Sequence, residues 1–93
     1  MYFVYLLQCK DGSLYTGITN DVSRRLRQHR AGSGAAYTRA KKVDKLLYTE
    51  QAKSRSAALV REAEIKRWSR QKKLDLVGRG REGAGFDTMI VWS

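Results

Sequence analysis

The chain has 93 residues, enough for one domain, and contains a single cysteine and a single histidine. These counts exclude a disulfide framework and a zinc site of the usual Cys/His kind, so any bound metal is expected to be a hard cation on oxygen ligands. The net charge of +10 suggests a polyanionic partner, and with no apolar run near the roughly 20 residues of a membrane span and no secretory signal pattern, we expect a cytoplasmic protein.

The first predicted elements are two strands joined by a tight turn. The segment Tyr2 to Cys9 (YFVYLLQC) is apolar on both faces and rich in β-forming residues, which predicts a central strand. The tripeptide Lys10-Asp11-Gly12 is typical of a turn, and Leu14 to Ile18 predicts the returning strand of a hairpin.

The loop of this hairpin decides on which faces of the sheet Tyr5 and Tyr15 lie. Side chains alternate along a strand, so a two-residue turn would place the two tyrosines on opposite faces. We predict a three-residue loop instead, with Gly12 at positive φ and Cys9 paired with Ser13. That register puts both tyrosines on one face, where they can serve one site.

The later elements are marked by capping residues and glycines. The sequence predicts a helix from a cap at Asn20 or Asp21 to about Ala31, followed by a basic loop over Ala35 to Lys42. A strand is predicted over Leu46 to Glu50. Two further helices are predicted, one from Ser54 or Ser56 to about Trp68 and one over Arg70 to Val77, closed by Gly78. The β-β-α-β-α-α order predicts an α+β domain over residues 1–78, with a three-stranded, mainly antiparallel sheet flanked by helices. Residues 79–85 are expected to be a Gly-rich linker, and Phe86 to Ser93 an apolar tail of no evident role.

The first predicted helix separates its basic residues into two sets. At about 100° per residue, Arg25 and His29 lie beside the apolar stripe and can reach the sheet. They are candidates for a site, although an arginine running along the edge of the core and a hydrogen-bonded boundary histidine explain the same pattern. The other three arginines face outward: Arg24, Arg27 and Arg30.

The next helix carries two glutamates in different positions. Glu62 falls within the apolar arc and Glu64 on the open side, where we expect it to be solvated. A carboxylate directed at the core is costly unless it is paired or bound to a cation. Glu62 is therefore a candidate metal ligand, with an internal salt bridge, for instance to Arg25, as the alternative.

Basic residues are concentrated in one segment, because eighteen Lys and Arg but only five acids lie between Arg24 and Arg81. We expect nucleic acid to be the partner, with a merely solvated surface as the alternative. The candidate phosphate-binding residues are Arg24, Arg27, Arg30, Lys41, Lys42, Arg67, Lys72 and Lys73, and Tyr37 is a candidate for stacking on an unpaired base.

The same residues also match a known family. The run Tyr15-Thr16-Gly17, with Arg25 eight residues after the glycine, resembles the second half of the GIY-YIG signature. Phe3-Val4-Tyr5 resembles its first half. His29 matches a histidine found in several branches of the family. Phe3 and Thr16 depart from the usual glycine and isoleucine. The resemblance covers about residues 2–78 and looks closest to the small stand-alone bacterial, UPF0213-like members.

This resemblance implies an endonuclease that hydrolyses phosphodiester bonds with Mg²⁺ (or Mn²⁺), with DNA rather than RNA as the expected substrate. Glu62 resembles the family's metal ligand, Arg25 would hold the phosphate as a planar fork, and a tyrosine would act as general base. We assign that role to Tyr15, with Tyr5 assisting or orienting water, although both could instead pack on the sheet. A phenol needs a nearby cation to work at neutral pH.

Two other functions remain open at this stage. One is a non-catalytic module of the same fold that binds DNA or RNA through its basic helices. The other is a small subunit that takes its target specificity from a protein partner, with Phe86 to Trp92 as the candidate contact.

Overall fold

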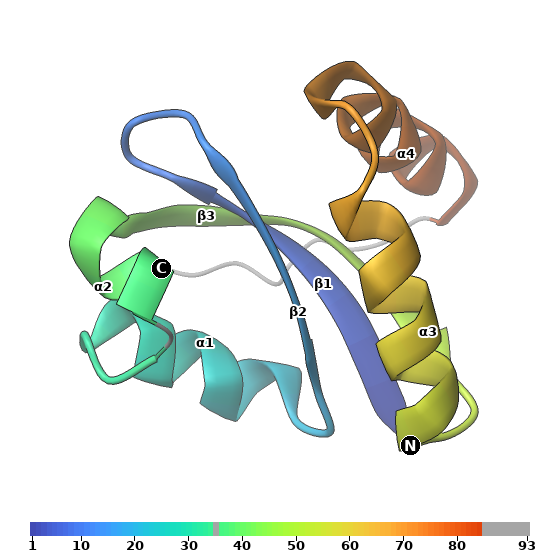
Figure 1. Ribbon diagram of the computed structural model, residues 1–93, viewed down its shortest axis with the longest axis horizontal. Coiled ribbons are helices and arrows are strands. Elements are labelled where there is room, and N and C mark those ends of the chain that lie inside the picture. The colour runs from blue at the N-terminus through green and yellow to red at the C-terminus, as the bar shows by residue number, and fades with distance from the viewer. Residues whose placement is uncertain (35, 85–93) are drawn as a thin grey trace.

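A three-stranded antiparallel sheet forms the centre of the molecule in the computed structural model, which describes residues 1–34 and 36–84 (Figure 1). Strand β1 (Tyr2–Cys9) lies between β2 (Leu14–Thr19) and β3 (Val43–Ala52). The predicted central strand is confirmed over the same residues. Its two apolar faces are the reason for its place, because a central strand is covered on both sides.

The hairpin between β1 and β2 has the predicted register. The Cys9 N–H donates to the Ser13 carbonyl and the Gly12 N–H donates to the Cys9 carbonyl, both at 2.9 Å, and Gly12 has φ of 88°. Only glycine adopts this left-handed conformation without strain, so the turn is built around Gly12. The three-residue loop is therefore confirmed, and Tyr5 pairs with Gly17 two residues from Tyr15.

Capping residues fix the starts of two helices as predicted. Helix α1 (Val22–Arg30) begins after Asp21, whose carboxylate accepts the Arg24 N–H at 3.0 Å. Helix α3 (Arg55–Lys66) begins after Ser54, whose hydroxyl accepts the Ala57 N–H at 3.1 Å. Each cap satisfies a backbone donor that has no partner within the helix.

Three boundaries differ from the prediction. The expected basic loop contains helix α2 (Ala36–Lys41), and β3 extends beyond Leu46 to Glu50 because it pairs along the whole of β1. Helix α4 (Arg70–Ala84) does not end at Gly78, so the prediction of a linker was wrong for residues 79–84, which are helical. A glycine inside a helix costs only about 1 kcal/mol, and the buried residues Leu76 and Val77 hold this helix against the sheet. The apolar tail, Phe86 to Ser93, lies outside the described residues.

The helices divide the core into two parts, one on each face of the sheet (Figure 1). Alternate residues of β1 point to opposite faces. Tyr5 and Leu7 pack with Leu26 of α1, whereas Val4 and Leu6 pack with residues of α3 and α4. The predicted α+β architecture with a flanked antiparallel sheet is confirmed.

Candidate active site

The two tyrosines of the hairpin lie over Gly17, the residue opposite Tyr5 on β2. Their ring centroids are 6.3 Å apart. A Cβ atom at Gly17 would lie 2.5 Å from the Tyr5 hydroxyl oxygen and 3.1 Å from the Tyr15 ring. Glycine at this position therefore lets both rings lie close against the sheet.

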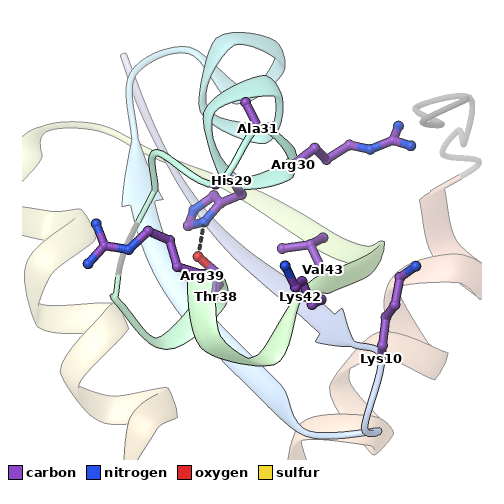
Figure 2. A pocket seen from close by; sticks show the side chains of 9 residues that line it. Lys10, His29, Arg30, Ala31, Thr38, Arg39, Lys42 and Val43 are labelled. Carbon is purple, nitrogen blue, oxygen red and sulfur yellow. Dashed lines mark hydrogen bonds between the residues drawn. The ribbon is translucent and has the colours of Figure 1, made fainter.

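A buried chain of hydrogen bonds connects β1, α1 and α2 behind the tyrosines. The Tyr5 hydroxyl is 2.9 Å from His29 Nε2, and His29 Nδ1 is 2.6 Å from the Thr38 hydroxyl (Figure 2). All three side chains are almost completely buried, with Tyr5 1%, His29 2% and Thr38 1% exposed. Buried polar groups joined in this way hold one another in a single arrangement.

Both titratable groups of this chain are uncharged at neutral pH. Burial raises the pKa of Tyr5 to about 12 against the opposing hydrogen bond from Arg25. Burial, followed by the charge of Arg25, lowers the pKa of His29 to about 4. Neutral His29 has one N–H, so it donates at one of these two hydrogen bonds and accepts at the other.

Tyr15 and Tyr37 form the more open side of the cluster. Tyr15 is partly buried, 5.5 Å from the His29 ring between centroids. Tyr37 of α2 stacks on Tyr15 at 5.8 Å with the ring planes 28° apart, and 40% of Tyr37 is exposed. Of the two catalytic candidates on the hairpin, Tyr15 is thus the one nearer to solvent.

Arg25 and Glu62 supply the charges beside the tyrosines. Arg25 is partly buried, donates to Gln28 Oε1 at 2.9 Å, and acts on the Tyr5 hydroxyl so as to lower its pKa. The Glu62 side chain is 17% exposed, pairs with Lys66 at 3.2 Å, and its charge acts on the Tyr5 hydroxyl. Within the described chain no ion pair joins Glu62 to Arg25, so the internal salt bridge considered for this carboxylate is replaced by an i,i+4 pair on its own helix.

The second glutamate lies away from this cluster, as expected from the helical wheel. The Glu64 side chain is 49% exposed and pairs with Arg61. Leu59 is 39% exposed, so the buried side of α3 is centred on Ala58 and Ile65 rather than on Leu59. Glu62 consequently lies at the edge of the buried face and not within it.

Metal binding at this site would depend on Glu62. No group of three or more His, Cys, Asp or Glu side chains that could hold a metal occurs in residues 1–34 and 36–84. A cage for Ca²⁺ or Zn²⁺ therefore does not fit the described residues. A single carboxylate fits Mg²⁺, which keeps several waters and is commonly bound through one or two carboxylates together with substrate phosphate.

The basic residues expected to contact nucleic acid fall into two groups. Arg24, Arg27 and Arg30 on α1 are exposed and join Tyr37, Lys41 and Lys42 in and after α2. Arg67 follows α3, and Lys72 and Lys73 lie on α4, where Lys72 covers the Trp68 ring at 4.4 Å. The two groups belong to helices on opposite faces of the sheet, and only the first lies with the histidine and the tyrosines.

Thr38 is the site residue that sequence reasoning missed. It lies in a short helix with no marked cap, within a basic run where no periodic apolar pattern points inward. Its contact partner, His29, is nine residues earlier and reaches it only through the fold. No feature of the sequence identified this hydroxyl.

Comparison with known proteins relates this geometry to one family. The family model described as the GIY-YIG catalytic domain matches residues 1–75. The chain is 47% identical over 79 residues to a UPF0213 protein of Staphylococcus saprophyticus, a match that covers 85% of this chain and 96% of that protein. It is 51% identical over 79 residues to a UPF0213 protein of Haloquadratum walsbyi, covering 85% and 89%.

Two solved structures are similar to the whole fold. The solution NMR structure of a UPF0213 protein from Bacillus halodurans has 46% identity and a TM-score of 0.53, with 85% of each chain covered. That of a protein from E. faecalis has 37% identity and a TM-score of 0.59, with 94% of each chain covered. None of the helices in the described ranges is long and apolar enough to cross a membrane.

Proposed function

Because the chain belongs to the GIY-YIG family, whose catalytic-domain model matches residues 1–75, we propose that it is an endonuclease that hydrolyses phosphodiester bonds in nucleic acid. The observation that carries this proposal is the position of Arg25. Its guanidinium acts on the hydroxyl of Tyr5, whose ring centroid lies 6.3 Å from that of Tyr15, and the charge of Glu62 acts on the same hydroxyl. A fixed cation beside phenols and one carboxylate is suited to a phosphate that must be held and attacked by water.

Arg25 would bind the scissile phosphate. A guanidinium presents parallel N–H donors that match two phosphate oxygens, and its charge offsets the charge that develops as water attacks. The Gln28 side-chain oxygen already orients this side chain before substrate arrives. The rate therefore gains from a donor that needs little reorganisation.

The two tyrosines would divide the handling of water. Tyr15 is partly exposed, so we assign it, as the phenolate formed by loss of its own proton to solvent, the removal of a proton from the attacking water. Burial raises the pKa of Tyr5 to about 12, so its hydroxyl stays protonated, and we assign Tyr5 to orienting the water rather than deprotonating it. His29 and Thr38 hold Tyr5 in place from behind.

Glu62 would hold Mg²⁺ or Mn²⁺, releasing its present ion pair with Lys66. When bound there, such a cation supplies charge neutralisation at the phosphate and at the leaving oxygen. The expected partner is DNA rather than RNA, drawn to the basic surface of α1 and α2. A protein partner would supply the choice of target, because phosphate contacts read no sequence.

The direct test is a cleavage assay on a panel of end-labelled DNA and RNA substrates that includes single strands, duplexes, flaps and junctions. We expect at least one substrate to be cut with Mg²⁺ or Mn²⁺, and cutting to stop in EDTA. Arg25→Ala protein purified in the same way controls for a contaminating nuclease. Cleavage that persists in that variant contradicts the assignment, and binding without cleavage under every condition favours a non-catalytic binding module.

A further inference from the structure

A pocket of about 270 Å³ lies beside the buried chain but is lined by neither catalytic tyrosine. His29 and Thr38 form its inner wall, and the surrounding residues come from the β1–β2 turn, the end of α1, and the segment that joins α2 to β3 (Figure 2). The same histidine therefore touches Tyr5 through Nε2 and faces this separate hollow.

The charged side chains around the pocket are all basic. They are Lys10, Arg30, Arg39 and Lys42, and none of the acidic residues whose side chains the structure describes lines the pocket. The carboxylate of the turn, Asp11, is occupied by Ser13 and Lys41. Lys10, Arg39 and Lys42 form no ion pair with another residue of the described chain. Three cations without an ion pair in the described chain, at the wall of a hollow, favour an anionic ligand.

The backbone at Lys42 gives independent support. Its φ of 66° makes it the one non-glycine residue with positive φ in the described ranges. Glycine or asparagine adopts this conformation more readily, and a strained residue retained by its surroundings often marks a functional position. The Lys42 N–H donates to the Thr38 carbonyl at 2.9 Å, and its carbonyl accepts the Lys10 N–H at 2.8 Å. These bonds fix two lysines beside one another at the pocket.

We propose that this pocket binds a phosphate monoester, carried by the end of a nucleic-acid strand or by a free nucleotide. A monoester is close to a dianion at neutral pH and offers three acceptor oxygens, which suits several cations better than the single charge of a backbone phosphodiester. The volume lies just below the roughly 300–1,000 Å³ typical of small-molecule sites, so it suits a phosphate with its sugar rather than a dinucleotide.

This inference deepens the proposed function and depends on it for the source of the phosphate. Arg25 would hold the bond to be cut, whereas the pocket behind His29 would hold a strand end. Since His29 and Thr38 line the pocket and support Tyr5, an occupant would contact the same residues that position the catalytic face. Recognition of an end would thus select where on a strand the enzyme acts.

The test is an NMR titration of ¹⁵N-labelled protein at constant ionic strength and without Mg²⁺. The probes are inorganic phosphate, deoxyadenosine 5′-monophosphate and deoxyadenosine. We expect the two phosphates to shift the amides of Lys42, Val43 and Gly32 in a saturable manner, and the nucleoside to shift none of them. Equal shifts with the nucleoside, or no saturable shift with either phosphate, overturn the proposal.

A pair of variants separates the pocket from general surface charge. Lys42→Asn keeps a residue that tolerates the left-handed backbone, and we expect it to weaken monophosphate binding by about tenfold or more, as for loss of one charge-assisted contact. Lys45→Asn removes the same charge from an exposed site on β3 outside the pocket and should leave binding unchanged. Equal losses in the two variants contradict a specific site.

The source of the phosphate follows from oligonucleotides with and without a 5′- or 3′-terminal phosphate. Tighter binding of a phosphorylated end that is lost in Lys42→Asn supports strand-end recognition. Equal binding of all ends, with monophosphate binding retained, supports the pocket with a free nucleotide as its ligand. These titrations involve no cleavage and can be repeated with Arg25→Ala, so a protein that fails as a nuclease still tests the pocket.

Discussion

The two faces of the sheet solve different problems with alternate residues of the same strand. On the α1–α2 face, Tyr5 of β1 is buried in a polar chain with His29 and Thr38. On the α3–α4 face, the buried core around Val4 and Leu6 is aliphatic. The hydrogen bonds of this face lie at its partly buried edge, where Glu50 accepts from Tyr48 and from Arg61. The buried core of one face is thus held by specific hydrogen bonds and that of the other by apolar packing.

This difference shows where each face is sensitive. A hydrogen-bonded chain depends on protonation and on single atoms, whereas an aliphatic core depends on volume. Glu62 is the exception, because it is carried by α3 but acts electrically on Tyr5. The packing of the α3–α4 face therefore supports the position of one charge at the site.

The largest effects are expected from the charges that meet at the site. Arg25→Ala and Glu62→Ala should each reduce the cleavage rate about 100–1,000-fold, or about 2.7–4 kcal/mol, the usual effect of losing one transition-state contact. Rates are measured under single-turnover conditions on the best substrate, with circular dichroism to verify the fold. Glu64→Ala is the matched control, since that carboxylate is half exposed on the other side of α3. Loss of activity in Glu64→Ala but not in Glu62→Ala would reverse our assignment.

The buried histidine should make stability fall in mild acid. The pKa of His29 is about 4 in the folded protein and near 6.5 when unfolded, so the unfolded chain binds more protons between these values. The contribution of neutral His29 to the free energy of unfolding should be fully present above about pH 6.5 and decrease as the pH falls towards 4. The total decrease should be up to about 3 kcal/mol. Urea unfolding between pH 7 and 4 measures it.

His29→Gln provides the reference for this acid effect, because carboxylates also titrate in part of the range. The variant is expected to be less stable at pH 7 but to show a shallower decrease towards pH 4. Parallel curves for the two proteins would mean that His29 is not held neutral by the fold, and the hydrogen-bonded chain to Thr38 would lose its support.

Two glycines offer opposite tests of the two faces. Gly17→Ala forces a methyl group against Tyr5 and Tyr15, and overpacking of this kind typically costs about 1–3 kcal/mol. We expect both a lower melting temperature and slower cleavage. Gly78→Ala in α4 meets no atom within 4 Å and should instead stabilise the protein by about 0.5–1 kcal/mol with unchanged cleavage. Unaltered activity in Gly17→Ala would show that the tyrosines need no close approach to the strand.

Volume changes on the α3–α4 face should affect stability alone. Ile65 is fully buried, and Ile65→Val should lower the free energy of unfolding by about 0.5–1.5 kcal/mol. The cleavage rate of the folded protein should stay within about twofold of wild type, because the change lies among aliphatic contacts. A tenfold slower rate with this small change in stability would show that α3 packing controls the position of Glu62.

Local rules predicted the sheet and much of the site. The hairpin register followed from the preference of Gly12 for positive φ and from the alternation of strand side chains, which together place Tyr5 beside Tyr15. The helical repeat then placed Arg25 and His29 towards the same face. Each of these steps depends on residues close in the chain, where turn chemistry and periodicity are informative.

The parts that could not be predicted depend on contacts between distant segments. Helix α2 has only six residues, too few for a stable isolated helix, and its Thr38 is held by a hydrogen bond to His29. Helix α4 continues through Gly78 because packing at Leu76 and Val77 outweighs a weak local preference. Likewise, the large apolar residue Leu59 is 39% exposed, since the sheet contacts the neighbouring stripe of α3 that contains Ala58 and Ile65.

The smallest expected effect concerns the two groups of basic residues. If about five charges engage duplex DNA, log K against log salt should have a slope near −4.5, from about −0.9 for each phosphate contact. A rigid duplex on the α1–α2 face cannot also reach α4, because the sheet lies between them. Replacing both Arg24 and Arg27 with Gln should therefore make the slope about 2 units shallower, whereas Lys72→Gln with Lys73→Gln should leave it almost unchanged. Fluorescence anisotropy between about 50 and 200 mM salt measures both slopes.

Both arginines are exposed, so the fold should persist in the variant that replaces Arg24 and Arg27. Equal reductions in the two double variants would mean that nucleic acid contacts both faces, as a flexible single strand wrapped around the domain could do. A slope near zero in the wild-type protein would remove phosphate neutralisation as the reason for the basic surface, and with it the electrostatic support for both nuclease and binding functions.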